Sequence, residues 1–157
     1  MGTWLAGIGP KGIRELCLNF SGQKKLPAGR HLDQHPGKYP SLFNRLDKRL
    51  RRYLDGKPEA FDLPLDFGEM TPFQLNVTTT LRTVAFGKTI SYGDLARSAG
   101  FPGAARAVGQ CMSRNRLIVM VPCHRVLAAR GGLGGYSGGI DIKLKLLHLE
   151  KALVPLP

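Results

Sequence analysis

The amino-acid sequence predicts a mixed α/β fold of the α+β type, in which a small sheet-containing part precedes a mainly helical part. Two apolar segments separated by Gly-Pro-Lys-Gly open the chain, which is typical of a β-hairpin. Two capping signatures mark the starts of helices in the second half. The 157 residues suffice for one domain or for two small packed subdomains, which we place at 1–69 and 70–157.

The first part is predicted to contain the hairpin, one helix and little other regular structure. Residues 3–8 and 13–20 are the two apolar strands, and the polar segment 21–40 is expected to be a loop. Leucine recurs at every fourth position of residues 41–55, which predicts an amphipathic helix. Apolar residues alternate along 61–67, which indicates either a short strand or an extended connector.

The second part begins with three predicted helices. Thr71, followed by proline and then by Gln74, forms a capping box that opens a helix, which Gly87 is expected to end. Ser91 opens a short second helix, and residues 104–113 form a third. Two short helices joined by a glycine-containing turn are a candidate helix-turn-helix, although an ordinary helical pair in a core fits the same periodicity.

The end of the chain combines a buried segment, a loop and a last helix. Residues 117–121 are continuously apolar and are expected to be buried, and the glycine-rich residues 131–139 must be a loop that approaches something closely. This loop lacks the pattern of a phosphate-binding loop. Residues 141–151 are predicted to form an amphipathic helix. The side chains expected to face inward are Leu144, Leu147 and Ile140.

The charge distribution favours a polyanionic partner. The chain carries 23 basic and 11 acidic residues, for a net charge of +12. Residues 70–157 hold 11 basic but only three acidic side chains, against 12 and eight in residues 1–69. The second part is therefore the better candidate for a nucleic-acid surface, the alternative being charge that serves solubility. No apolar run approaches the ~18 residues of a membrane span, so no membrane partner is expected.

Cysteine usage points to one candidate nucleophile. The three cysteines are an odd number without a Cys-x-x-Cys pair, which argues against a disulfide framework and fits a reducing compartment. Cys123 stands at the end of the buried run, next to His124, which could favour its thiolate, and Glu150 could orient the imidazole. In an extended segment the two side chains would point to opposite sides, so a bend or a bridging water is required. The alternative is an inert buried cysteine beside a surface His-Arg pair.

The segment 122–126, Pro-Cys-His-Arg-Val, resembles the active-site motif of the O6-alkylguanine-DNA alkyltransferases, also called methylated-DNA–protein-cysteine methyltransferases. Residues 104–109 are similar to the recognition helix of that family, Asn115 stands eight residues before the cysteine as the family's asparagine does, and residues 135–139 resemble its active-site loop. The residues that resemble its closing helix are Lys143, Leu146, Leu147 and Glu150. The resemblance covers about residues 71–150 and is ordered and nearly gapless.

The resemblance implies an RNase H-like first subdomain packed on a second one that carries a DNA-binding helix-turn-helix. It further implies that the protein binds double-stranded DNA through the minor groove and rotates O6-alkylguanine out of the base stack. The alkyl group would pass irreversibly to Cys123, so that one molecule acts once, and O4-alkylthymine is a further candidate substrate.

The roles implied for single residues fall into three groups. The catalytic group comprises Cys123 as nucleophile, His124 as the base acting through a water, Glu150 as its holder, Asn115 as a brace of the turn, and Tyr92 as a hydrogen-bond donor. The DNA contacts comprise Arg106, which fills the space of the flipped base, with Ala105, Ala107, Gly109, Tyr92 and Arg125. The base pocket comprises Tyr136, Ser137, Met112, Val126 and Gly138.

No cofactor is expected, because a thiolate displaces an alkyl group without one. No metal is expected either, since Cys17, His31 and His35 are too few and lack a familiar ligand spacing. We expect a monomer in the cytoplasm, or in the nucleus of a eukaryote, with cooperativity on DNA left open. Two other function classes are alternatives: a DNA-lesion binder without chemistry, against which Cys123 argues, and a Cys–His hydrolase, which would leave Arg106 and the basic excess unexplained.

Overall fold

The structure is a computed structural model that describes residues 3–19 and 38–152. The chain divides into two compact units. Unit 1 comprises Met1–Gly68 together with Arg116–Ile118, and unit 2 comprises Glu69–Asn115 and Val119–Pro157. Both contain helices and strands, which confirms the predicted mixed α/β class.

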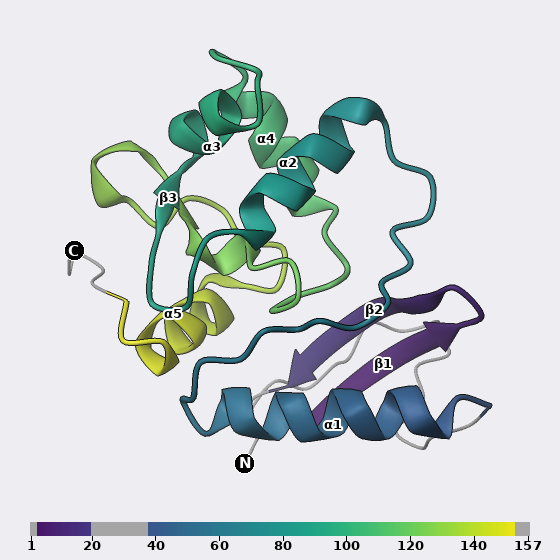
Figure 1. Cartoon of the computed structure of the whole chain (residues 1–157). Helices are drawn as coiled ribbons and strands as arrows, with labels where there is room; N and C mark the ends of the chain where they lie inside the picture. Colours follow the sequence, from purple (N-terminus) through teal and green to yellow (C-terminus); the bar gives the residue numbers. More distant parts are fainter. Residues whose placement is uncertain (1–2, 20–37, 153–157) are drawn as a thin grey trace. The chain divides into compact units, whose positions relative to one another are not determined.

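Unit 1 contains the predicted hairpin (Figure 1). Strand β1 (Thr3–Gly9) pairs antiparallel with β2 (Gly12–Asn19). Gly12 has φ +134, and a Cβ at this position would lie 2.4 Å from the carbonyl oxygen of Pro64, so only glycine fits there. The segment 116–118 joins this unit because the backbone N–H of Leu16 donates to the Arg116 carbonyl at 2.8 Å.

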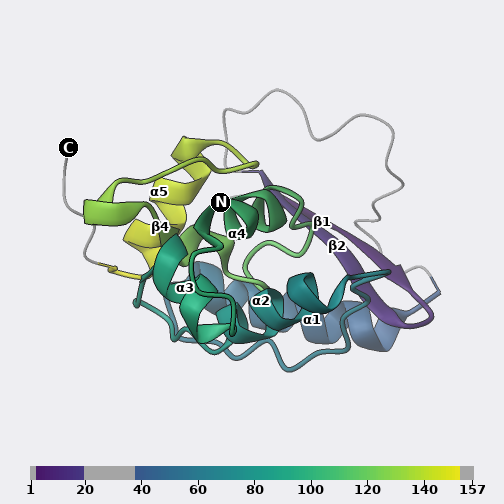
Figure 2. The same ribbon diagram turned by 90° about the horizontal axis from the view of Figure 1, so that it is seen from above.

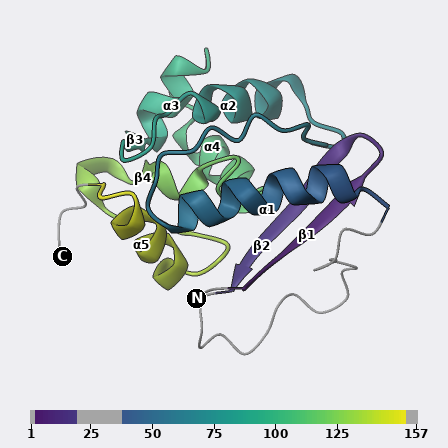
Figure 3. The ribbon, with the colours of Figure 1, turned by 60° about the horizontal axis from the view of Figure 1, so that its bottom comes forward.

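The predicted helix of unit 1 is α1 (Pro40–Leu54), which lies alongside the hairpin (Figure 3). The rings of Trp4 and Phe43 are 5.2 Å apart, which ties the helix to β1. Residues 61–67 are an extended connector rather than a strand, since a single bridge joins Leu65 to β2. Most of the predicted loop at 21–40 lies outside the described residues.

Three helices of unit 2 pack side by side (Figure 2). They are α2 (Pro72–Arg82), α3 (Tyr92–Ser98) and α4 (Ala105–Ser113), and they confirm the three predicted helices. The capping box of α2 is present, with the Gln74 backbone donating to the Thr71 hydroxyl and the Thr71 backbone donating to the Gln74 side chain. That α3 and α4 act as a helix-turn-helix stays a prediction.

The predicted end of α2 near Gly87 is wrong, because the helix ends at Arg82. The backbone N–H of Val84 donates to the carbonyl of Leu81 in a tighter turn, at 3.0 Å. Gly87 has φ +73 and lies in the connection that leads to β3 (Ile90–Ser91).

The last part of unit 2 contains two elements that differ from expectation. Strand β3 pairs in parallel with β4 (Val126–Leu127), and two-residue strands are too short to show a period in the sequence. Helix α5 (Ile140–Leu149) was predicted, but Ile140 is exposed instead of facing inward. The buried face of α5 begins two residues later and comprises Ile142, Lys143, Leu146 and Leu147. No helix among the described residues is long and apolar enough to span a membrane.

Candidate active site

The chain around the predicted nucleophile bends sharply. Residues Cys123–Arg125 form a single 3-10 turn, in which the Arg125 N–H donates to the Pro122 carbonyl at 2.9 Å. This turn is the bend that the sequence analysis named, together with a bridging water, as one way to bring the two side chains to the same side. Just before it, Val119 has φ +69, a rare conformation for a β-branched residue that costs of order 1–3 kcal/mol. Such strain persists only where the surrounding packing imposes it.

The Cys123 thiol is buried and accepts a hydrogen bond. Its residue is 3% exposed. The Asn115 amide, which follows the end of α4, donates to the sulfur at 3.0 Å and to the Val121 carbonyl at 2.9 Å. Burial raises the pKa of the Cys123 thiol, whereas the hydrogen bonds from Asn115 and Tyr136 and the charge of Lys143 act in the opposite direction. The amide thus favours the thiolate and also braces the turn.

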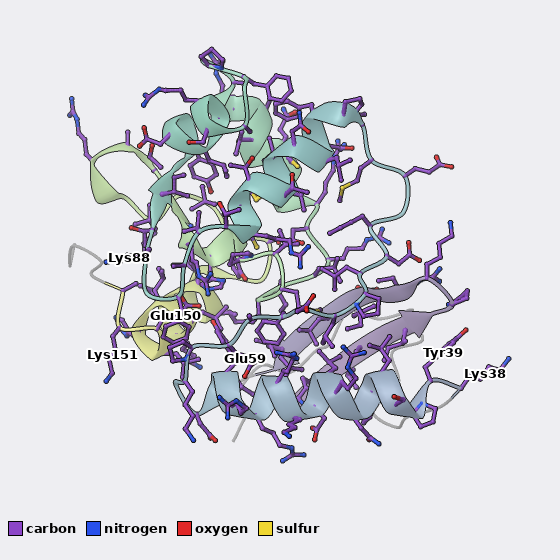
Figure 4. The ribbon with its side chains drawn as sticks, in the orientation of Figure 1. Lys38, Tyr39, Glu59, Lys88, Glu150 and Lys151 are labelled. Atoms are coloured by element: carbon purple, nitrogen blue, oxygen red, sulfur yellow. The ribbon has the colours of Figure 1, made fainter. Side chains whose placement is uncertain are left out.

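The imidazole of His124 is fully buried against Glu150, which follows the end of α5 and is labelled in Figure 4. The distance from Nε2 to Oε1 is 2.8 Å. Burial lowers the pKa of His124, the adjacent Glu150 carboxylate raises it, and the charges of Arg125 and Lys143 lower it. The net shift is downward, so the imidazole is neutral near pH 7 and can accept a proton.

Arg125 is placed differently from the sequence expectation. The residue is 7% exposed, and its guanidinium donates to both carboxylate oxygens of Glu150 at 2.8 and 2.9 Å. It also donates to the Val84 carbonyl. The expected DNA contact through this side chain does not fit this geometry, because its donors are turned into unit 2 and are already engaged.

Lys143 is the site residue whose role the residue-by-residue reasoning missed. It is fully buried on α5, and its ammonium donates to the carbonyls of Val126 and Leu133. Burial lowers its pKa from 10.5 to about 8, while the nearby Cys123 acts to raise it. The helical spacing was a usable signal, since Lys143 stands three and four positions before the buried Leu146 and Leu147.

The glycine-rich loop packs against Tyr92 of α3 and against its own Tyr136. The hydroxyl of Tyr92, the first residue of α3, donates to the Gly135 carbonyl at 3.4 Å. A Cβ on Gly134 would lie 3.1 Å from the Tyr92 ring, and one on Gly138 would lie 2.9 Å from the Tyr136 ring. Burial, and then the charge of Cys123, raise the pKa of Tyr92, so its phenol keeps its proton at neutral pH. The loop glycines therefore allow close approach, as predicted.

The remaining predicted residues lie on α4 and around the loop. Arg106 and Ala107 are exposed on α4, and Ala105 and Gly109 are half-buried. A Cβ on Gly109 would lie 3.9 Å from the Tyr92 ring, which places this end of α3 against α4. The predicted pocket residues divide into buried Met112 and Val126, half-buried Tyr136 and Gly138, and exposed Ser137.

The structure thus joins two clusters in one turn: Cys123 with Asn115, and His124 with Glu150 and Arg125. No group of three or more His, Cys, Asp or Glu side chains that could hold a metal ion occurs within residues 3–19 and 38–152. Of the three soft ligands considered from the sequence, His31 and His35 lie outside that range. A buried thiol with an amide donor and a buried neutral imidazole can perform a nucleophilic displacement.

Comparison with known proteins agrees with this arrangement. The family described as 6-O-methylguanine DNA methyltransferase, DNA binding domain, matches residues 72–152. The methylated-DNA–protein-cysteine methyltransferase of Mycobacterium tuberculosis is 42% identical over 129 residues, which are 82% of this chain and 75% of that protein. The protein of the same name from Methanosarcina acetivorans is 43% identical over 109 residues, 69% of each chain.

Solved structures show the same fold over nearly the whole chain. Mycobacterium tuberculosis OGT in complex with DNA matches with a TM-score of 0.72 at 37% identity, covering 94% of this chain and 92% of that one. The O6-methylguanine-DNA methyltransferase of Pyrococcus kodakaraensis matches with a TM-score of 0.67 at 28% identity, covering 95% and 91%. Because the family model matches residues 72–152 and the relatives match in both sequence and fold, the chain belongs to the family of O6-methylguanine-DNA methyltransferases, the methylated-DNA–protein-cysteine methyltransferases.

Proposed function

We propose that this protein repairs duplex DNA by transferring the alkyl group of O6-alkylguanine irreversibly to its own Cys123. The observation that carries the proposal is the buried Cys123 thiol, whose sulfur accepts a hydrogen bond from the Asn115 amide at 3.0 Å. The same turn carries His124, which contacts Glu150. The relatives named methylated-DNA–protein-cysteine methyltransferase and the DNA complex of the M. tuberculosis protein support both the reaction and the partner.

The reaction is a displacement at the alkyl carbon. The thiol proton of Cys123 passes to the neutral His124 through a water, and the sulfur forms a bond to the carbon as the carbon–O6 bond breaks. The electron pair of that bond goes to the guanine, which takes a proton from the Tyr92 hydroxyl. The proton first taken by His124 returns through solvent to Tyr92, so the net products are a thioether and an ordinary guanine. A thioether has no good route back to a thiol, and the protein acts once.

Base flipping is required because the alkyl carbon is inaccessible within a duplex, and it costs a few kcal/mol. Exposed Arg106 on α4 is the residue proposed to refill the stack, since a long cation can occupy the gap. The small side chains of Ala105, Ala107 and Gly109 allow the helix backbone to approach the minor groove. The proposed pocket for the flipped base is lined by Tyr136, Ser137, Met112, Val126 and Gly138.

The distribution of unpaired cations supports binding through unit 2. Three of the four arginines of α1 have carboxylate partners, since Arg49 and Arg52 pair with Glu59 and Arg51 pairs with Asp47. Several exposed cations of unit 2 have no carboxylate partner among the described residues. They are Arg106, Arg114, Arg130, Lys88 and Lys151. Unpaired surface cations are free to displace counterions from DNA phosphates.

The test is the intact mass of the protein after it is mixed with a duplex oligonucleotide carrying one O6-methylguanine, followed by peptide mapping. We expect one methylene to be gained per molecule, on the Cys123 peptide, with no second turnover when more substrate is added. Lesion-dependent binding without mass gain would indicate a lesion binder, and neither binding nor mass gain would reopen the Cys–His hydrolase. A parallel duplex with O4-methylthymine tests the second substrate.

We also propose that the protein acts as a monomer in the cytoplasm, or in the nucleus of a eukaryotic cell. Sedimentation with and without duplex DNA measures the oligomeric state and shows whether binding is cooperative.

A further inference from the structure

Arg125 makes a buried, three-way contact that the displacement reaction itself does not use. Its Nε donates to Glu150 Oε2 at 2.9 Å, and one terminal nitrogen donates to Oε1 at 2.8 Å. The other terminal nitrogen donates to the Val84 carbonyl. The two bonds to one carboxylate form the bidentate arrangement that a guanidinium makes and an ammonium cannot.

The carboxylate of Glu150 is shared between this arginine and the imidazole. Oε1 contacts both Arg125 and His124 Nε2 at 2.8 Å. Oε2 accepts from the Gly87 backbone N–H at 3.1 Å as well as from Arg125. All four donors converge on a side chain that is fully buried. A guanidinium carries a permanent positive charge in proteins, so it pairs best with the ionised form of this carboxylate.

A buried carboxylate needs a counter-charge, and two groups compete to provide it. Without the guanidinium, the negative charge would draw a proton onto the His124–Glu150 pair, because an isolated charge at this depth is very unfavourable. An imidazolium cannot accept a proton from the thiol. With the guanidinium in place the charge is already balanced, and His124 can donate from Nε2 to the carboxylate while Nδ1 keeps its lone pair.

We propose that Arg125 is a positioning residue that grips Glu150 and supplies its counter-charge, so that His124 stays a neutral imidazole able to accept the proton of Cys123. This inference rests on the proposed function and deepens it. The charged groups that act on His124 are Glu150, Arg125 and, on α5, Lys143. Lys88 and Lys151, on neighbouring segments, are exposed to solvent (Figure 4).

The experiment compares four full-length proteins: wild type, Arg125→Gln, Arg125→Lys and the control Arg97→Gln. Arg97 is an exposed arginine of unit 2 that pairs with Asp94 at 2.9 Å. Its replacement also removes an arginine–carboxylate pair, but one that lies on the surface instead of beside His124. The rate of Cys123 alkylation by iodoacetamide is measured from pH 5.5 to 9.5 by peptide mass. This reagent needs neither DNA nor an O6-alkylguanine, so the result is independent of the proposed substrate.

We expect the fall in the alkylation rate at low pH, the acid limb of the pH–rate profile, to move to higher pH in Arg125→Gln. In Arg125→Gln the His124–Glu150 pair holds its extra proton to higher pH, so alkylation is about tenfold slower near pH 6.5, the effect of a shift of about one unit. The rate approaches that of the wild type as pH rises above 8. Arg125→Lys keeps the charge without the fork and restores most of the acid limb, whereas Arg97→Gln leaves it unchanged. The titration of Lys143 near 8 occurs in all four proteins and cancels in the ratios.

If Arg125→Gln slows alkylation equally at every pH, or leaves the pH–rate profile unchanged, the inference is overturned. A merely structural role of Arg125 would not move the midpoint of that profile. If Arg125→Gln does not fold, the wild type still provides a test through the imidazole nitrogen shifts of His124 in nitrogen-15-labelled protein. We expect the neutral form with its proton on Nε2 at pH 7, and an imidazolium there would refute the proposal. Failure of the proposed function would instead appear as a wild type that is not alkylated by O6-methylguanine duplex.

Discussion

Replacing Asn115 by alanine removes the amide that donates to the Cys123 sulfur at 3.0 Å and to the Val121 carbonyl at 2.9 Å. A hydrogen bond to a charged acceptor contributes ~1.5–3 kcal/mol, which corresponds to about one to two units in the pKa of the thiol. Burial already raises the pKa of Cys123, and the substitution acts in the same direction. The thiolate fraction at pH 7 therefore falls by about 10- to 100-fold.

A more basic thiolate is also a better nucleophile, and this offsets part of the loss. With a Brønsted slope of about 0.4–0.5, the reactivity of each thiolate rises by roughly 3- to 8-fold over the same shift. The net prediction is a rate that is about 3- to 10-fold lower at pH 7. Above the midpoint of the thiol titration nearly all of the thiol is ionised in both proteins, so the rate difference disappears or reverses and the variant reacts as fast as the wild type or faster.

The assay is the second-order rate of reaction with free O6-benzylguanine from pH 6 to 10.5, followed by release of guanine. Ser113→Ala is the matched control, because its exposed hydroxyl lies near the end of the same helix and contacts only the Gln110 carbonyl among the described residues. A loss that keeps the same size above the midpoint of the thiol titration would refute the reasoning. It would show that Asn115 acts only through the Val121 carbonyl, by placing the turn.

The remaining predictions concern the nucleophile, the flipped base, the phosphate contacts and the turn at Gly87. Cys123→Ala abolishes transfer but keeps lesion binding in a gel shift, and loss of both would show that the thiol is structural. Arg106→Ala slows transfer from duplex DNA far more than reaction with free O6-benzylguanine, and an equal loss on both would contradict stack filling. Affinity for duplex DNA, measured by fluorescence anisotropy, falls steeply between 50 and 200 mM salt, whereas a flat profile would exclude phosphate contacts. Gly87→Ala lowers the free energy of unfolding in urea by about 2–3 kcal/mol, against about 1 kcal/mol for Gly100→Ala. Both glycines have positive φ, but only at Gly87 would a Cβ meet a backbone atom, the Glu150 carbonyl oxygen at 2.9 Å.

Local patterns in the sequence were sufficient for most elements. The hairpin turn, the capping box at Thr71 and the leucine period of α1 are short-range signals, and each is present where it was predicted. The order of the Pro-Cys-His-Arg-Val segment, the small-residue helix and the glycine-rich loop was enough to identify the family. These features depend on neighbours within a few residues, which is why a single sequence reveals them.

The partners of the site residues depended on tertiary structure. The family resemblance placed Arg125 among the DNA contacts, yet it is buried against a carboxylate 25 residues away. Lys143 lies on the buried face of α5, where Ile140 and Leu144 were predicted instead, and its ammonium donates to the carbonyl of Val126. The parallel pair β3–β4 is likewise formed by contacts between distant segments.

The sequence by itself determined which chemistry this protein carries, because the residue types and their order specify a thiol, an imidazole and a carboxylate with a basic helix nearby. Only the tertiary structure decided which charge balances which. A buried ion must find a partner wherever the fold brings one, and the segment at Val84–Gly87, the turn at Cys123–Arg125 and the end of α5 meet at a single carboxylate. That meeting follows from packing across more than 60 residues of chain, and no local pattern encodes it.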